Sequence, residues 1–350
     1  MPTFKKRVET FWEWYSKNSA KFYAKIEAGK AAELAKPVSE AVHKCLPGFS
    51  FVFGPGPDEQ GHSFTLTGEG KPGYLLLASY WKEQAPKIEG WTFHEARQPS
   101  LLTGGEKIRI GEMEFGSGEL LVRPLIHEEE ELLGLDFWHP NFPDCDENLR
   151  FTVFNLWLDE SLGELGTNTW VGSAECKDIT GDPQAFPIFK LKAFLDYTCK
   201  EREWEKLPPH EAITVYQIPE PTNEFPRSDT IAGNTRVMDL VGDFLNSKGN
   251  MADPVPGLGA KFIYVGIDRD RFPKGDEVNF REEISEALDK ALRENRSGEM
   301  VGGALGLSGG YVDLVIYDGN NSLKLVKQVL QQKGLAEDSF LMPFADPKSE

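Results

Sequence analysis

The chain of 350 residues lacks the patterns by which metal-binding and membrane proteins are usually recognised. Its four cysteines, Cys45, Cys145, Cys176 and Cys199, form no C-x-x-C pair. That spacing excludes a cysteine-rich zinc site and is typical of reduced thiols. No window approaches the ~18 apolar residues of a membrane span, and the N-terminus has no continuous apolar segment of a signal peptide. We therefore expect a cytoplasmic protein without a membrane partner.

Short catalytic and cofactor motifs are absent as well. The six histidines form no H-x-x-x-H pair, and the sequence contains no G-x-S-x-G nucleophile elbow. Catalytic groups are often spread along a chain, so these absences leave enzymatic activity open. We expect no cofactor.

Positive charge is scarce, with 38 basic against 56 acidic residues and a net charge of -18. A nucleic-acid partner is not expected, because such binding depends on neutralisation of phosphates by Lys and Arg. The acidic residues are spread along the chain, which favours either simple solubility or a surface that meets a basic protein. The densest acidic run is "HEEEE", residues 127–131, which is either a solvated edge or part of such a surface.

The composition changes near residue 207. All eight tryptophans occur at or before Trp204, and five prolines then follow between positions 208 and 226. Prolines at that density break helices and mark an exposed connector. We predict an N-terminal domain over 1–206, a proline-rich connector over 207–228 with one strand at 213–218, and a C-terminal domain over 229–350.

Hydrophobic periodicity predicts an α+β fold for both domains. In the N-terminal domain we expect helices over 4–26 and 32–46, a hairpin from 49–54 and 62–68, a helix over 74–86, and strands at 91–97, 107–115, 119–127 and 131–139. The run Leu149–Leu158 suits a helix or a buried strand, and a helix is favoured. The C-terminal domain has the order strand, helix, strand, strand, helix, strand, which predicts a ferredoxin-like βαββαβ domain.

Five glycines lie between residues 302 and 310, in "GGALGLSGG". A phosphate-binding loop needs the order strand, glycines, helix, whereas here a strand is expected on each side. We interpret the segment as a hairpin in which the glycines supply positive φ and room for close backbone approach.

Two groups of polar residues are candidate sites. Asp136, His139, Asp144 and Asp146 are residue types that bind metals, but two nearby prolines make a simple loop the alternative. Asp159 and Glu164 are paired carboxylates suited to acid–base work if their pKa values differ. The alternative is that these carboxylates only mark the end of a helix that stops at Gly163.

Several phrases together resemble a bacterial family of uncharacterised two-domain proteins. They are "FWEWYSKN" (11–18), "APKIEGWTFHEAR" (85–97), "HPNFP" (139–143), "LDESLGE" (158–164) and the C-terminal glycine segment. The family pattern is a W-x-W-[FY]-x-x-N helix followed by an LD-x-x-LGE motif. Similar domains occur beside a ferredoxin-like regulator of ribonuclease activity, an acidic protein that acts by binding an enzyme. The link to that regulator is an analogy of fold alone, and the resemblance carries over no catalytic residue.

From the sequence we expect a non-catalytic, acidic binding or regulatory protein that inhibits or sequesters a basic protein partner. One alternative is a hydrolase that uses Asp159, Glu164 and His139. Another is a small-molecule sensor that uses the ferredoxin-like domain. A cleft with converging carboxylates favours the hydrolase, and a flat acidic face favours the binding protein.

Overall fold

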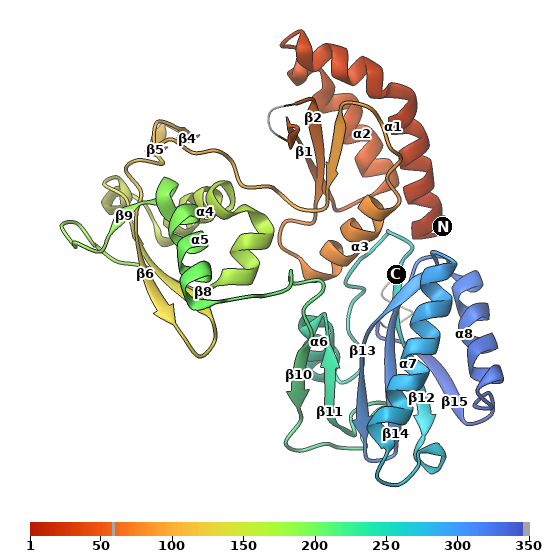
Figure 1. Ribbon diagram of the computed structural model, residues 1–350. Helices are drawn as coiled ribbons and strands as arrows, with labels where there is room; N and C mark the ends of the chain where they lie inside the picture. Colours follow the sequence, from red (N-terminus) through yellow and green to blue (C-terminus); the bar gives the residue numbers. More distant parts are fainter. Residues whose placement is uncertain (58–59, 346–350) are drawn as a thin grey trace.

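The computed structural model describes residues 1–57 and 60–345. These residues combine helices with four β-sheets, which confirms the predicted α+β class. Figure 1 shows three lobes. We name them the N-terminal module (1–95), the middle module (102–204) and the C-terminal module (214–345).

The N-terminal module packs helices against a small sheet. Its elements are α1 (Phe4–Glu27), α2 (Ala35–Cys45), β1 (Ser50–Pro55), β2 (His62–Thr67), α3 (Pro72–Glu83) and β3 (Trp91–His94). β1 and β2 form the predicted hairpin, and β3 pairs in parallel with β2 because α3 returns the chain. The apolar stripe of α1, including Phe4, Phe11 and Tyr15, is buried as expected.

The middle module contains a sheet covered by two helices. Its elements are β4 (Lys107–Ile110), β5 (Met113–Gly116), β6 (Leu121–His127), β7 (Leu132–Trp138), α4 (Glu147–Trp170), β8 (Val171–Cys176), β9 (Phe186–Pro187) and α5 (Leu191–Arg202). The single strand expected over 107–115 is wrong, because the chain turns at Gly111 and forms the hairpin β4–β5. Leu149–Leu158 is helical and lies in α4.

The C-terminal module contains the predicted strand and helix succession within a larger sheet. Its elements are β10 (Thr214–Gln217), β11 (Thr230–Thr235), α6 (Met238–Asn246), β12 (Lys261–Asp268), α7 (Glu277–Glu294), β13 (Gly298–Gly306), β14 (Gly309–Ile316), α8 (Asn320–Gln332) and β15 (Ser339–Pro343). The sheet order is β10-β11-β13-β14-β12-β15. The name ferredoxin-like stays a prediction, since β10 and β11 extend the sheet beyond β13.

The glycine-rich segment forms the predicted hairpin, β13 and β14, and one of the two roles expected for its glycines is wrong. The glycines lie within the two strands: Gly302, Gly303, Gly306, Gly309 and Gly310. None of these five has the positive φ that was expected. The expected close approach is present, because a Cβ at Gly309 would overlap the Ile267 carbonyl oxygen and one at Gly310 would overlap the Phe272 ring.

Buried apolar side chains of the described residues form three clusters. The first joins the helices and sheet of the N-terminal module to the face of the C-terminal sheet that carries Tyr264 and Tyr311. The second lies within the middle module, and the third lies between the other face of the C-terminal sheet and α7 and α8. The N-terminal and C-terminal modules therefore share one core, and the middle module has its own.

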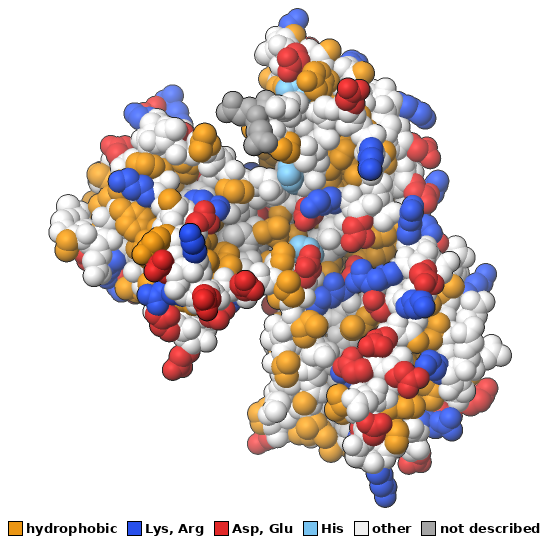
Figure 2. Space-filling view, viewed as in Figure 1, with side chains coloured by type: hydrophobic (Ala, Val, Ile, Leu, Met, Phe, Trp, Pro, Cys, Tyr) orange, Lys and Arg blue, Asp and Glu red, His pale blue; other side chains and the backbone are white. Residues whose placement is uncertain are grey.

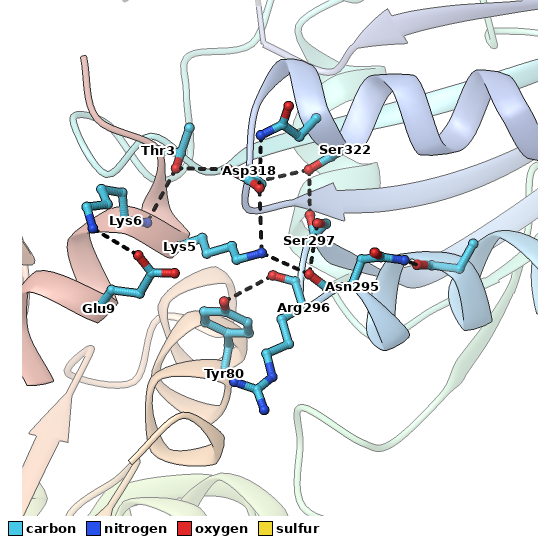
Figure 3. Close-up of polar contacts among 12 residues, drawn as sticks. Thr3, Lys5, Lys6, Glu9, Tyr80, Asn295, Arg296, Ser297, Asp318 and Ser322 are labelled. Carbon is cyan, nitrogen blue, oxygen red and sulfur yellow. Dashed lines mark hydrogen bonds and ion pairs between the residues drawn. The ribbon is translucent and has the colours of Figure 1, made fainter. Parts of the chain in front are cut away.

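Polar contacts reinforce the shared core where α1 begins (Figure 3). The Thr3 hydroxyl donates to Asp318 over 3.3 Å, and the Lys5 ammonium donates to the Asn295 carbonyl over 2.9 Å. From α3, the Tyr80 hydroxyl donates to the Arg296 carbonyl over 3.1 Å. Segments that are almost 300 residues apart in sequence thus meet at one place.

The predicted domain border at 207–228 stays a prediction that limited proteolysis tests. We expect the first cut in this largely exposed segment, and we expect the two fragments to remain associated in gel filtration because they share the first apolar cluster. Separation should require denaturant. A fragment 229–350 that elutes alone in native buffer would contradict the shared core.

A second prediction concerns the close approach at Gly310. Gly310→Val should lower the free energy of unfolding by ~1–3 kcal/mol, because the new side chain overlaps the Phe272 ring. The control is Gly242→Ala in α6, where a Cβ meets nothing within 4 Å. Alanine there should raise stability by up to ~1 kcal/mol, because it is a better helix former. Urea denaturation measures both, and equal effects would refute the steric explanation.

Candidate functional site

A cavity of about 660 Å³ lies between the N-terminal module and α4 of the middle module. Its walls come from β1, β2, the end of β3, the connecting segment 97–101 and α4. Its polar lining includes the side chains of Ser63, Thr65, His94, Arg97, Asp159 and Glu160. Figure 2 shows a hollow between the corresponding lobes. We name this cavity the α4 cleft, because junctions between modules with a few converging polar groups are the usual setting of ligand sites.

Gly163 breaks α4 beside the cleft. Its φ of +73° and ψ of 163° are not helical. A Cβ at this position would lie 2.9 Å from the Arg97 carbonyl oxygen, so the segment 97–99 can pack directly against the helix backbone. The next amide, that of Glu164, donates to the same Arg97 carbonyl over 3.0 Å. The break predicted at Gly163 is present, although the helix resumes after it.

The carboxylate of Glu164 joins the middle module to the N-terminal module. It is 4% exposed and accepts three hydrogen bonds: from the Thr67 hydroxyl at 2.6 Å, the Gly70 amide at 2.8 Å and the Arg97 amide at 3.2 Å. A buried charge is tolerated only with such partners. We infer that Glu164 holds the two modules together and is not free to react.

Asp159 lies one helical turn earlier and lines the same cleft. Burial, followed by the nearby Glu164 charge, raises its pKa from 3.8 to about 6, although Arg97 opposes the shift. The carboxyl therefore exchanges its proton close to neutral pH, which is what general acid–base catalysis requires. The structure brings Asp159 and Glu164 together, as the sequence pattern suggested, and gives them different roles.

His94 and Arg97 complete the polar lining from the other side. Burial lowers the pKa of the His94 imidazole, and the Lys82 charge lowers it further, while Glu95 opposes the shift. Arg97 pairs with Glu69 at 2.8 Å. At the other end of the segment, the Ser100 amide donates to the Glu160 carbonyl over 2.7 Å.

His139, the third residue of the expected hydrolase group, lies elsewhere. It is buried at 1% exposure inside the middle module, with its ring 5.1 Å from that of Phe115. Its Nδ1 accepts a hydrogen bond from the Asn141 amide at 3.1 Å, and burial lowers the pKa of the imidazole. His139 does not line the α4 cleft, so the structure does not bring it to Asp159.

The four metal candidates lie in different surroundings. Asp136 is buried in β7, where it accepts a hydrogen bond from Arg123 Nε at 3.1 Å and pairs with Lys177 at 3.4 Å. Asp146 caps α4 by accepting a hydrogen bond from the Leu149 amide at 2.8 Å, and Asp144 is exposed at the end of the short 3-10 helix Phe142–Asp144. Within residues 1–57 and 60–345, no three His, Cys, Asp or Glu side chains form a group able to hold a metal ion.

The acidic run 127–131 forms the tip of the β6–β7 hairpin, and Glu128, Glu129 and Glu130 are exposed there. Arg202 of α5 pairs with Glu128, and the Lys206 ammonium donates to the Glu130 carbonyl over 2.6 Å. The tip is therefore a hairpin turn partly neutralised by its own module, and it is not a flat acidic face.

Sequence patterns alone missed the side chains that face Asp159, namely His94, Arg97 and Ser100. Arg97 ends one of the phrases that carry the family resemblance, and Leu158–Glu164 is another. Nothing in their sequence spacing indicated that these two phrases meet in space.

A larger cavity of about 700 Å³ runs along α1 and is lined by Lys5, Glu9, Glu13, Lys17, Tyr80 and Arg296, among others. Two of its charged side chains are already engaged, because Lys5 pairs with Asp318 at 3.6 Å and Glu9 pairs with Lys6 at 3.1 Å. We place the functional site in the α4 cleft because its described walls bring the half-buried Asp159 carboxyl, with its near-neutral pKa, against a second module.

Comparison with known proteins adds no relative, since no family model, curated protein or solved structure matches this chain. Among the described residues, no helix has the length and apolar character needed to cross a membrane.

The raised pKa of Asp159 predicts a pH-dependent cost to stability. The folded state binds a proton more tightly than the unfolded state, so stability falls as pH rises from about 4 to about 6. Asp159→Asn removes this cost and should raise the free energy of unfolding by ~1–2 kcal/mol at pH 7.5, with no gain at pH 3.5. Urea denaturation at both pH values measures it. A loss of stability at pH 7.5 would contradict the assigned environment.

Proposed function

We propose that the protein is a hydrolase that holds a small substrate in the α4 cleft, with Asp159 as the group that exchanges a proton with it. The observation that supports this proposal is the position of Asp159, half-buried in a cleft of about 660 Å³ beside the hydrogen-bonded Glu164. Perturbed carboxyls in clefts are candidates for catalysis for a physical reason: the same burial that raises the pKa also strengthens interactions with substrate.

Each cleft residue has a distinct part in this proposal. Above pH 6 the ionised Asp159 accepts a proton from a water molecule, which attacks the substrate, and the proton then passes to the leaving group. Arg97 stays paired with Glu69 and forms part of the polar wall of the cleft. Glu164 acts as a positioning residue, because its three hydrogen bonds fix the module that carries Asp159.

The charges of the cleft indicate the substrate class. Asp159 and Glu160 line it, and among the described lining residues the one Lys or Arg side chain, that of Arg97, is already paired with Glu69. An anionic substrate would be repelled. Phe53, Pro55 and Pro99 add apolar surface, so the proposed substrate is neutral or cationic with an apolar part.

Binding of a basic protein partner is a second proposal, supported by the net charge of -18 and by the exposed Glu129 and Glu130. We further propose a cytoplasmic location, supported by four cysteines that form no disulfide. Membership of the uncharacterised bacterial family is also a proposal. Two of the sequence segments that carry the resemblance end at Arg97 and at Glu164. The Arg97 amide donates a hydrogen bond to the Glu164 carboxylate, so these two segments are in contact.

The hydrolase proposal predicts turnover of one class in a panel of p-nitrophenyl esters, p-nitrophenyl glycosides and amino-acid p-nitroanilides. Asp159→Asn should reduce kcat/KM by ~100-fold or more, since proton transfer by a positioned group contributes about that much. In the wild type, kcat/KM should rise through pH 6 as Asp159 ionises.

The matched control is Glu160→Gln, which changes the neighbouring carboxyl of the same cleft. Because Glu160 takes no part in the proposed proton transfer, this variant should alter kcat/KM by less than about threefold. Turnover of no class in the panel would sink the hydrolase proposal. So would turnover that Asp159→Asn leaves unchanged.

A further inference from the structure

Strand β10 is an end strand of the six-stranded sheet, and within the described residues no strand pairs with its outer side. Its inner side pairs with β11 in an antiparallel register that places Val215 opposite Asn234 and Tyr216 opposite Gly233. An open strand edge is a ready template for pairing with another chain.

The register fixes which backbone groups point outward. The Ile218 amide donates to the Ile231 carbonyl over 2.8 Å. Because bonded and non-bonded pairs alternate along an antiparallel ladder, Thr214 and Tyr216 direct their backbone groups to β11. The amides and carbonyls of Val215 and Gln217 therefore point to the open edge.

The side chains at this edge are apolar and unusually exposed. Val215 is 75% exposed and Ile213 is 60% exposed, whereas Tyr216, which follows Val215, is buried. Ile213 and Val215 project from the same face of the strand, and that face is therefore uncovered. Figure 2 shows hydrophobic side chains along this edge of the lower lobe and acidic side chains beside them.

Acidic side chains stand at both ends of the edge. Glu211 and Glu220 are exposed just before and just after β10.

A second copy of the chain does not suit this edge. Antiparallel pairing of two β10 strands through their outward backbone groups would be centred on Val215 or on Tyr216, and either register brings Glu211 of each copy within one residue of the position opposite Glu220 of the other. Like charges this close on paired strands destabilise such a pair. A partner with cations at those positions would be stabilised instead.

We infer that the β10 edge binds an extended segment of a partner protein, with alternating apolar side chains and Lys or Arg at both ends, as an added β-strand. Outward backbone groups of Val215 and Gln217 provide the hydrogen bonds, Ile213 and Val215 provide apolar contact, and Glu211 and Glu220 select basic flanks. The inference deepens the proposed binding of a basic partner and is separate from the α4 cleft.

The test uses two fluorescein-labelled peptides, KKVTVTVKK and EEVTVTVEE, and the full chain, with binding followed by fluorescence anisotropy. The basic peptide should bind at least 10-fold more tightly than the acidic one, and the difference should shrink at 1 M salt as charges are screened. Val215→Pro should abolish binding of the basic peptide. Proline is tolerated at an edge position whose N–H faces solvent, so β10 should still pair with β11.

Val215→Thr is the matched control, because it keeps the amide and the branched shape, and it should bind within threefold of the wild type. Val215→Lys keeps the amide but repels basic flanks and should weaken binding at least 10-fold.

Equal binding of both peptides, or binding that survives Val215→Pro and Val215→Lys, would overturn the inference. Concentration-dependent dimers lost in Val215→Pro would overturn it in favour of a second copy. A basic protein that co-purifies equally with wild type and Val215→Pro would leave partner binding standing and reject this edge as its site.

Discussion

The buried carboxylate of Glu164 is the interaction on which the arrangement of the modules depends. The middle module has its own apolar core and shares none with the rest of the chain, so polar contacts set its position. Glu164 accepts bonds from Thr67, Gly70 and Arg97, which belong to the other side of the junction. Loss of any of these partners would leave a buried charge unsatisfied, at a cost of ~1–3 kcal/mol.

The same contact creates the environment of Asp159. Because Gly163 allows the segment 97–99 to approach α4 closely, the walls of the cleft come near enough to remove water from the Asp159 carboxyl. The Glu164 charge then adds to the effect of burial on its pKa. The two carboxylates, five residues apart, thus have different environments: Glu164 is hydrogen-bonded at the junction, and Asp159 lines the cleft. The residues of the β10 edge do not line this cleft.

Local patterns in the sequence predicted much of the fold. The apolar stripe of α1, the β1–β2 hairpin and the βαββαβ succession all follow from periodicity over neighbouring residues. Strands β8 and β11 were missed because Val171–Cys176 and Thr230–Thr235 contain glycine and polar residues that weaken a strand pattern. The candidate site was half predicted: Asp159 and Glu164 are neighbours in sequence, but His94 and Arg97 reach them only through the tertiary fold. His139 was wrongly grouped with them for the same reason.

The most direct test of the account is the titration of the Asp159 carboxyl, followed by carbon NMR with labelled aspartate in the wild type and in Glu164→Gln. The account predicts a pKa of about 6 in the wild type. It predicts a lower value in the variant, because the neighbouring negative charge is removed and the junction between the modules is weakened. A wild-type Asp159 that titrates at its ordinary value of 3.8 would contradict the existence of the site.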